Sequence, residues 1–212
     1  MIRSCRLPYH LTARSNNREK FPGSDLSYVW KVLTGELYLQ AVCHGVRAHS
    51  LVLMPNHFHL ILTSPRRDID LVMRDVLSSS TRIINTKHRR WGRVFGSRYF
   101  WTLIDNPVYY AHAIKYVSRN PVKAALCDEV AEYPFSTFGC AMGVAHLPLS
   151  IYPPSDALDA LLPAGLSSME QWLNIPYRSE ESDAIRRALR HKRFKLPLRR
   201  STRKPLRIAT EI

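Results

Sequence analysis

The pattern of hydrophobic and polar positions over the first 140 residues predicts strands and helices in alternation. Residues 7–14 alternate with a period of about two, which is typical of a half-buried strand. Two further strand candidates, residues 46–54 and 57–63, are separated by a Pro-Asn dipeptide that predicts a tight turn or a break in one long strand. Residues 98–104 are aromatic and β-prone, and they predict another strand.

Apolar residues at intervals of three and four predict three helices among these strands. The first covers residues 25–41 and the second 68–85, and each opens on an aspartate that can cap it, Asp25 and Asp68. The third covers residues 106–120, opened by an Asn-Pro pair and closed by the proline that follows it. The expected core positions of the second helix are Leu71, Val72, Val76, Ile83 and Ile84.

After about residue 140 the periodic signal is lost. Residues 141–180 are rich in Pro, Ser and Leu, whereas residues 184–212 hold eleven Lys and Arg against one acid. We therefore expect a folded body over residues 1–140 and an extension over 141–212 that ends in a basic tail. The tail can be a solvated end. Alternatively, it docks on a surface through apolar residues that interleave with the charges, namely Phe194, Leu196 and Leu198.

The overall charge narrows the partner class. The 212 residues carry a formal net charge of +14, with a pI near 10.0, which favours a polyanion as partner: nucleic acid first, an anionic membrane surface second.

No apolar run approaches the roughly 18–20 residues of a membrane span, and the first nine residues lack the apolar stretch of a signal peptide. The four cysteines are scattered, which argues against a structural zinc site or a disulfide framework and favours a reducing cytoplasm.

Two histidines interrupt the apolar alternation of the strand over residues 57–63. His57 and His59 are two positions apart and share one face of the strand, whereas Phe58, Leu60 and Leu62 face the other way. Two imidazoles side by side are a natural pair of metal ligands. The alternative is an ordinary histidine pair on a sheet face, which desolvation would penalise unless the rings had partners.

A tyrosine and an asparagine share one face of the last predicted helix, because Tyr116 and Asn120 are four positions apart. A phenol is a nucleophile candidate only when it is activated, because its free pKa of about 10 keeps it protonated at neutral pH. The Asn120 amide oxygen and two imidazoles would leave open positions on Mg²⁺ or Mn²⁺ for a scissile phosphate. Tyr116 can equally be a core or rim aromatic, because Tyr109 and Tyr110 lie in the same helix.

Five motifs between residues 7 and 139 occur in a recognisable order. They are Tyr9–Arg18, Met54–Leu60, Val94–Tyr99, Tyr116–Ala124 and Tyr133–Thr137. The second resembles the His-hydrophobic-His signature of the HUH single-tyrosine transposases. The fourth resembles the Tyr-x-x-x-Asn-Pro-Val-(Lys/Arg)-Ala segment of the REP-associated tyrosine transposases within that superfamily. The other three resemble that branch's opening strand and turn, its Phe-x-x-Arg-Tyr element and its closing motif.

The resemblance implies an α+β fold, with a ferredoxin- or RRM-like antiparallel sheet and helices packed on one face. It implies that residues 1–140 are a catalytic domain that nicks and rejoins single-stranded DNA at hairpin or repeat sequences through a 5′-phosphotyrosine. Tyr116 would be the nucleophile, and His57, His59 and Asn120 would bind the divalent metal, Mg²⁺ or Mn²⁺. The branch tends to act as monomers, so we expect a monomer in the bacterial cytoplasm, associated with the nucleoid.

We expect basic and aromatic side chains to hold the DNA, because single-strand binders combine a basic groove with stacking platforms. The loop at residues 89–93 offers Arg90, Trp91 and Arg93, and we predict that it touches a hairpin backbone. The other candidates are Arg14, Asn17, Arg18, Arg98, Tyr99, Trp101 and Arg119.

Other functions stay open. The chain can be a catalytically silent hairpin-binding module, a basic ribosomal or membrane-surface protein, or a ribonuclease that uses the histidine pair without metal. Binding of a nucleotide triphosphate is disfavoured, because there are only 8 glycines and no Gly-x-x-x-x-Gly-Lys loop.

Overall fold

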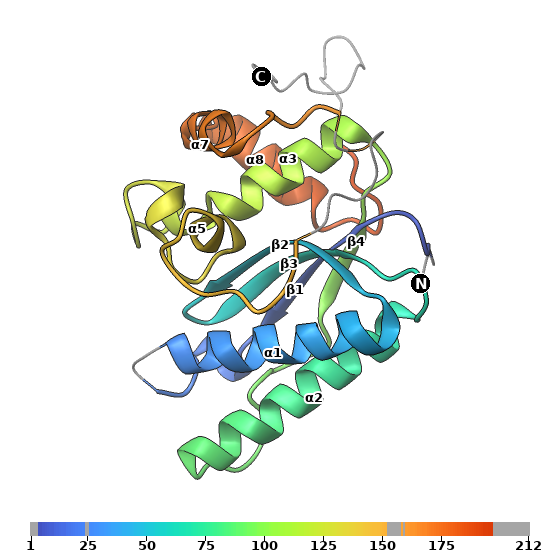
Figure 1. Ribbon diagram of the computed structural model, residues 1–212, viewed down its shortest axis with the longest axis vertical. Coiled ribbons are helices and arrows are strands. Elements are labelled where there is room, and N and C mark those ends of the chain that lie inside the picture. The colour runs from blue at the N-terminus through green and yellow to red at the C-terminus, as the bar shows by residue number, and fades with distance from the viewer. Residues whose placement is uncertain (1–3, 24–25, 152–157, 159, 197–212) are drawn as a thin grey trace.

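A four-stranded antiparallel sheet with the strand order β2-β3-β1-β4 forms the centre of the molecule (Figure 1). The computed structural model describes residues 4–23, 26–151, 158 and 160–196. The strands are β1 (Tyr9–Arg14), β2 (Arg47–Met54), β3 (His57–Thr63) and β4 (Phe100–Leu103). Helix α1 (Leu26–His44) joins β1 to β2, and α2 (Ile69–His88) joins β3 to β4. This βαββαβ order is that of a ferredoxin-like unit, so the predicted fold class is confirmed.

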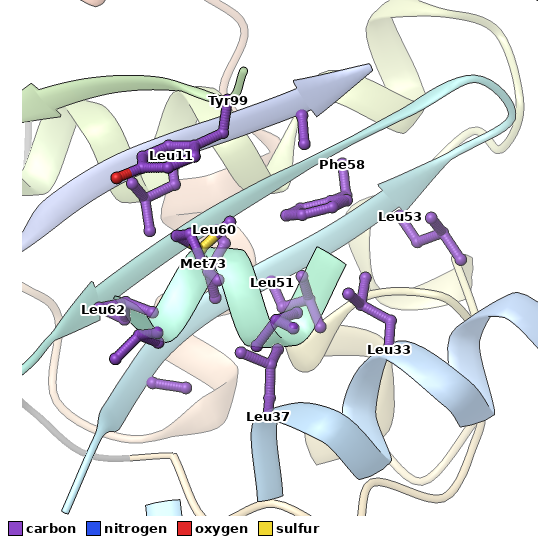
Figure 2. Close-up of a cluster of buried hydrophobic side chains, with 14 of the residues drawn as sticks. Leu11, Leu33, Leu37, Leu51, Leu53, Phe58, Leu60, Leu62, Met73 and Tyr99 are labelled. Carbon is purple, nitrogen blue, oxygen red and sulfur yellow. The ribbon is translucent and has the colours of Figure 1, made fainter. Parts of the chain in front are cut away.

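Helices α1 and α2 cover one face of the sheet (Figure 1). Alternate strand residues such as Leu11, Phe58 and Leu60 pack there against Leu37 of α1 and Met73 of α2 (Figure 2). Since strand side chains alternate between faces, the same register turns His57 and His59 to the opposite face.

The predicted signals at helix ends and turns are present where the structure describes them. The Asp68 side chain accepts the backbone N–H of Asp70 at 2.9 Å and caps α2. The Asn106 side chain accepts the N–H of Val108 at 2.9 Å and caps α3 (Pro107–Ser118). The predicted cap Asp25 lies outside the described residues.

One predicted core position is wrong. Leu71 is 40% exposed, whereas Val72 and Val76 of the same helix are fully buried. The buried stripe of α2 passes through Ile69, Val72, Met73 and Val76, and Leu71 lies beside it. An intrinsic period of 3.6 fixes the stripe only to within about one position when several apolar residues are adjacent.

The second face of the sheet is also covered. Helix α3 continues after a short break into α4 (Asn120–Lys123), with Pro121 in its first turn. The other helical segments whose bounds lie in the described residues are η1 (Asn16–Arg18), η2 (Val130–Glu132), α5 (Thr137–Ala141), α7 (Leu166–Asn174) and α8 (Ser179–Ala188). In Figure 1, α3, α7 and α8 lie across the sheet from α1 and α2. Helices therefore pack on both faces, not on one alone.

Part of the basic tail docks on the fold. Ile185 and Phe194 are fully buried in a cluster with Val52, Ile61 and Val117. The chain after α8 pairs with the edge of the sheet, because the backbone N–H of Leu103 donates to the Lys192 carbonyl and that of Phe194 donates to the Leu103 carbonyl, both at 3.0 Å.

These contacts select the docking interpretation for residues 184–196 of the tail. Leu198 and the basic residues that follow it lie outside the described residues. The boundary that we expect at residue 140 stays a prediction. Within the described part of the chain, no helix combines the length and the apolar character that crossing a bilayer requires.

Candidate active site

A pocket of about 730 Å³ brings the four residues of the two sequence patterns together. Its lining includes His57 and His59 of β3, Tyr116 of α3 and Asn120 of α4. The His57 and His59 rings have centroids 5.0 Å apart, and the rings of His59 and Tyr116 meet edge to face at 6.2 Å. The sheet and the helix that crosses it thus place the histidine pair next to the tyrosine.

The position of β3 explains why His59 is buried. Because β3 is an inner strand, His59 lies opposite Thr12 on one neighbouring strand and opposite Val52 on the other. His57 is two residue pairs nearer the hairpin end and lies opposite Arg14. The two imidazoles therefore sit at different depths in the same pocket.

Hydrogen bonds engage both imidazoles through Nδ1. The Asn56 Nδ2 donates to the Arg18 carbonyl at 2.9 Å, which turns the Asn56 Oδ1 toward His57. His57 Nδ1 lies 2.7 Å from that oxygen and must donate to it, because an amide oxygen only accepts. His57 Nε2 then keeps its lone pair. His59 Nδ1 lies 2.9 Å from His10 Nε2 and 3.1 Å from Thr12 Oγ1, two groups that can each donate or accept a hydrogen bond.

Burial keeps these rings neutral. Desolvation lowers the pKa of His57 to about 4, with a further contribution from the nearby Arg14. The pKa of His59 falls well below its usual value for the same reason, and the neighbouring rings and Arg14 lower it further. Burial also lowers the pKa of His10 to about 3. Neutral imidazole is the form that binds a metal, so the pair is in its ligating state at neutral pH.

The donor set fits a hard or borderline divalent cation. Asn120 Nδ2 donates to the Tyr116 carbonyl at 2.9 Å, which leaves its Oδ1 as the atom for a ligand. Among the described residues, no group of three or more His, Cys, Asp or Glu side chains is placed to hold a metal ion. A cation here would therefore use the two imidazoles and the amide oxygen, with the remaining positions open to water or phosphate.

The Tyr116 phenol is half-buried and stays protonated at neutral pH. Burial raises its pKa, while the charges of Arg186, Arg190 and Arg14 act in the opposite direction. The adjacent Lys115 is turned elsewhere, since its Nζ lies 4.8 Å from the centre of the Trp172 ring. The positive charges around Tyr116 therefore offset part of the effect of burial and make ionisation of the phenol easier than burial alone would.

Residues that the sequence patterns did not single out complete the pocket. His10 and Thr12 alternate with Leu11 in β1 and contact His59, as the hydrogen bonds above show. Arg186, in the last turn of α8, and Arg190, in the turn after that helix, line the pocket together with Tyr116. The period-two pattern of the first strand could have revealed His10. Nothing in the tail's composition could have placed the two arginines.

Five of the predicted DNA-binding residues line one of two hollows in the described part of the chain. Arg14, Arg18 and Arg98 line the pocket, and Arg98 also forms an ion pair with Asp70. A second hollow, of about 450 Å³, lies at the C-terminal end of α2 and is lined by Arg90 and Trp91 among others. Arg93 and Asn17 are exposed outside both hollows.

Two predicted stacking platforms are wrong. Tyr99 is 7% exposed, and its ring lies in the apolar cluster under the sheet (Figure 2). Its hydroxyl donates to Asp70 Oδ1 at 2.6 Å. Trp101 is equally buried, with its ring edge against Tyr9. Both side chains belong to the face that α1 and α2 cover, so neither can stack on a base.

Arg119 also has a different place from the one expected. Its Nη1 donates to the carbonyls of Leu173 at 2.7 Å and Asn174 at 2.6 Å, at the C-terminal end of α7. It borders a separate pocket of about 500 Å³ that shares only Tyr116 with the first. In this structure Arg119 therefore holds α7 against α3 instead of reaching into the histidine pocket.

Comparison with known proteins identifies the family. The family described as transposase IS200 like matches residues 4–120, more than half of the chain. The chain belongs to the IS200-like transposases. The match ends at Asn120, so it contains the histidine pair, the tyrosine and the asparagine, while α7 and α8 lie beyond it.

Two relatives of this IS200-like transposase are REP-associated. The REP-associated tyrosine transposase of Escherichia coli (strain K12) is 32% identical over 89 residues, which is 41% of this chain and 51% of that protein. The matched segment thus spans about half the length of that relative. A solved structure of a REP-associated tyrosine transposase bound to a REP hairpin superposes with a TM-score of 0.57. It shares 22% sequence identity and covers 74% of this chain and 92% of its own, so it supports the fold.

Proposed function

We propose that this IS200-like transposase nicks and rejoins single-stranded DNA at hairpin or repeat sequences through a covalent bond between Tyr116 and a 5′-phosphate. The observation that carries the proposal is the shared pocket of His57, His59, Tyr116 and Asn120, which come from three different elements. Both imidazoles form their hydrogen bonds through Nδ1, and a cation would be bound through Nε2 of each ring.

The reaction conserves bonds and protons. The Tyr116 oxygen attacks phosphorus, the bond from phosphorus to the 3′-oxygen breaks, and the DNA keeps a free 3′-hydroxyl. The phenol loses a proton and the departing 3′-oxygen gains one. The new phosphotyrosine keeps the energy of the broken bond, so a 3′-hydroxyl can reverse the step and rejoin the strand without a nucleotide triphosphate.

The pocket's own side chains hold the reacting groups. His57 and His59 through Nε2 and Asn120 through Oδ1 would bind Mg²⁺ or Mn²⁺, the cofactor that we propose. When bound, such a cation offsets the charge that develops on the non-bridging phosphate oxygens. Arg14, Arg18 and Arg98 would bind the neighbouring phosphates and set the position of the strand.

The second hollow suits the duplex part of the substrate. Trp91 is 96% exposed beside Arg89 and Arg90, and Asn85 Nδ2 donates to the Gly92 carbonyl at 2.7 Å and fixes the loop. The similar solved protein is described as bound to a REP hairpin, which supports a hairpin substrate here. Action as a monomer in the bacterial cytoplasm, close to the nucleoid, belongs to the same proposal.

The test is formation of a covalent adduct. Labelled single-stranded hairpins from the flanks of the chain's own gene are incubated with the protein, with Mn²⁺ or Mg²⁺ or with chelator, and run on a denaturing gel. We expect a protein–DNA band that needs the cation, persists in Tyr109→Phe and disappears in Tyr116→Phe. The Tyr109 variant is a matched control from the same helix.

The other outcomes separate the alternatives. An adduct that survives in Tyr116→Phe would refute the assignment of the nucleophile. Tight binding without an adduct, both on these hairpins and on a randomised single-strand pool, would favour the catalytically silent module. Cleavage of RNA in chelator would favour the ribonuclease.

A further inference from the structure

Helix α8 is fixed firmly next to the candidate active site. Ile185 and Ala188 are buried in the cluster that α8 shares with the sheet and α3. The Thr102 hydroxyl of β4 donates to the Leu189 carbonyl at 2.7 Å, and Lys123 Nζ of α4 donates to the Ser182 hydroxyl at 2.6 Å. These contacts tie both ends of α8 to elements that also carry the pocket, so its exposed side chains have defined positions.

Two arginines at the C-terminal end of α8 belong to the pocket. Arg186 lies in the last turn of the helix, and Arg190 lies in the turn that follows the end of the helix at Ala188. Both are exposed, and both line the pocket together with His57 and Tyr116. Arg187 is equally exposed in the same helix and does not line the pocket.

The charged side chains that line the described part of the pocket are all positive. Its described lining holds five arginines and no carboxylate: Arg14, Arg18, Arg98, Arg186 and Arg190. Arg186 also forms an ion pair with Asp183 at 3.2 Å, and both partners are about half exposed. An exposed pair of this kind is weak, so the Arg186 guanidinium can exchange the Asp183 carboxylate for another anion at little cost in free energy.

We propose that Arg186 and Arg190 bind the backbone phosphates adjoining the scissile phosphate, so that α8 and the turn after it form one wall of the DNA-nicking site. The inference rests on the proposed function. Guanidinium groups match phosphate oxygens with two parallel N–H donors, and their positive charge displaces counterions from the phosphate backbone. Because α8 lies beyond residue 120, this part of the site is not within the family match.

The experiment compares Arg186→Ala/Arg190→Ala with the matched control Arg187→Ala and with Arg186→Lys/Arg190→Lys. Binding of a labelled single-stranded hairpin is measured in chelator over a series of salt concentrations, and adduct formation is measured with Mn²⁺. Thermal unfolding of each variant establishes that the exposed substitutions leave the fold intact.

We expect the double alanine variant to bind about ten-fold more weakly than wild type, a loss typical of removing charge-assisted hydrogen bonds at an exposed site. The slope of log K against log salt should become shallower by about 1.4, since each phosphate contact on a single strand contributes about 0.7. The lysine variant should keep the slope, Arg187→Ala should behave as wild type, and adduct formation should fall in the double alanine variant only.

Equal affinity and equal slope in the double alanine and Arg187→Ala variants would overturn the inference. So would faster adduct formation in the double alanine variant, because the arginines would then restrain the site. If wild type binds with the expected salt dependence but forms no adduct, the proposed reaction fails while the phosphate contacts stand. If wild type forms the adduct and the variants do not differ, only the role of α8 fails.

Discussion

His10 Nε2 lies 2.9 Å from His59 Nδ1, and the two rings stack with centroids 5.1 Å apart. Both histidines are buried in the centre of the sheet, on neighbouring strands. A ring that engages Nδ1 of a metal ligand sets both its orientation and its tautomer. His10 is therefore a positioning residue for His59 in the proposed cation site.

Replacing His10 with phenylalanine tests this role. The variant keeps most of the ring volume and removes the hydrogen bond, so we expect Mn²⁺ affinity to fall by about 10- to 100-fold. Hairpin binding in chelator should be unchanged. The matched control is His49→Phe, because His49 is a buried histidine that lies 2.7 Å from a threonine hydroxyl in the same sheet but outside the pocket. Equal Mn²⁺ affinity in His10→Phe and wild type would contradict the assignment.

The buried His112 predicts a dependence of stability on pH. Burial and the nearby Lys115 lower the pKa of His112 from 6.5 to about 4. Between these values the unfolded chain binds the proton and the folded chain does not, so the free energy of unfolding rises with pH. The stabilisation is complete above pH 6.5 and is lost as the pH falls toward 4.

The variant His112→Gln removes this titration and keeps a polar group opposite the Tyr177 hydroxyl, 2.9 Å from His112 Nδ1. Denaturant unfolding gives the free energy of unfolding at pH 7 and at pH 4. The difference between these two values should be smaller in His112→Gln than in wild type, by up to about 3 kcal/mol. The other buried histidines titrate in both proteins and cancel in the comparison. An unchanged difference would show that His112 is not neutral in the folded chain.

Arg119 should matter for stability and not for DNA. Its two hydrogen bonds to carbonyls of α7 involve a charged donor, so Arg119→Ala should lower the free energy of unfolding by about 2 kcal/mol. Hairpin affinity and its salt slope should stay as in wild type. A variant that unfolds normally but binds DNA ten-fold more weakly would restore the interpretation made from the sequence alone.

Trp91 should matter for DNA and not for stability. Stacking of a base on an exposed aromatic ring contributes about 1–3 kcal/mol, so Trp91→Ala should weaken hairpin binding by roughly ten-fold or more. The ring is almost fully exposed, so the unfolding temperature should not change. Tyr38→Ala, an exposed aromatic on α1, is the control and should leave binding unaltered. Equal losses in the two variants would remove the second hollow from the substrate path.

Local patterns predicted the first half of the chain well. Alternation in β1 and β3, the Asp68 and Asn106 caps and the Pro-Asn turn each depend on residues close in sequence. The spacing of His57 and His59, and of Tyr116 and Asn120, fixed which side chains share a face. These four residues meet in one pocket because α3 packs across the sheet. That packing cannot be predicted from the sequence of any single segment.

Tertiary contacts decided what the sequence could not. Tyr99 and Arg98 are neighbours with similar expected roles, but one ring is buried under the sheet while the other side chain reaches the pocket. Helices α7 and α8 are short and begin within the Pro- and Ser-rich stretch over residues 141–180, whose composition does not predict helices. The charge of the tail was evident, whereas the docking of Phe194 beside β4 required the three-dimensional arrangement.

The most direct test of the central claim is to locate the DNA on the chain. The adduct formed with Mn²⁺ is digested with nuclease and then with trypsin, and the modified peptide is identified by mass spectrometry. Cleavage after Lys115 and Arg119 releases Tyr116 in the four-residue peptide 116–119, while Tyr109 and Tyr110 leave in the peptide 99–115. We predict a nucleotide phosphate on Tyr116 in peptide 116–119. A nucleotide phosphate on peptide 99–115, or an adduct at any residue other than Tyr116, would contradict the account.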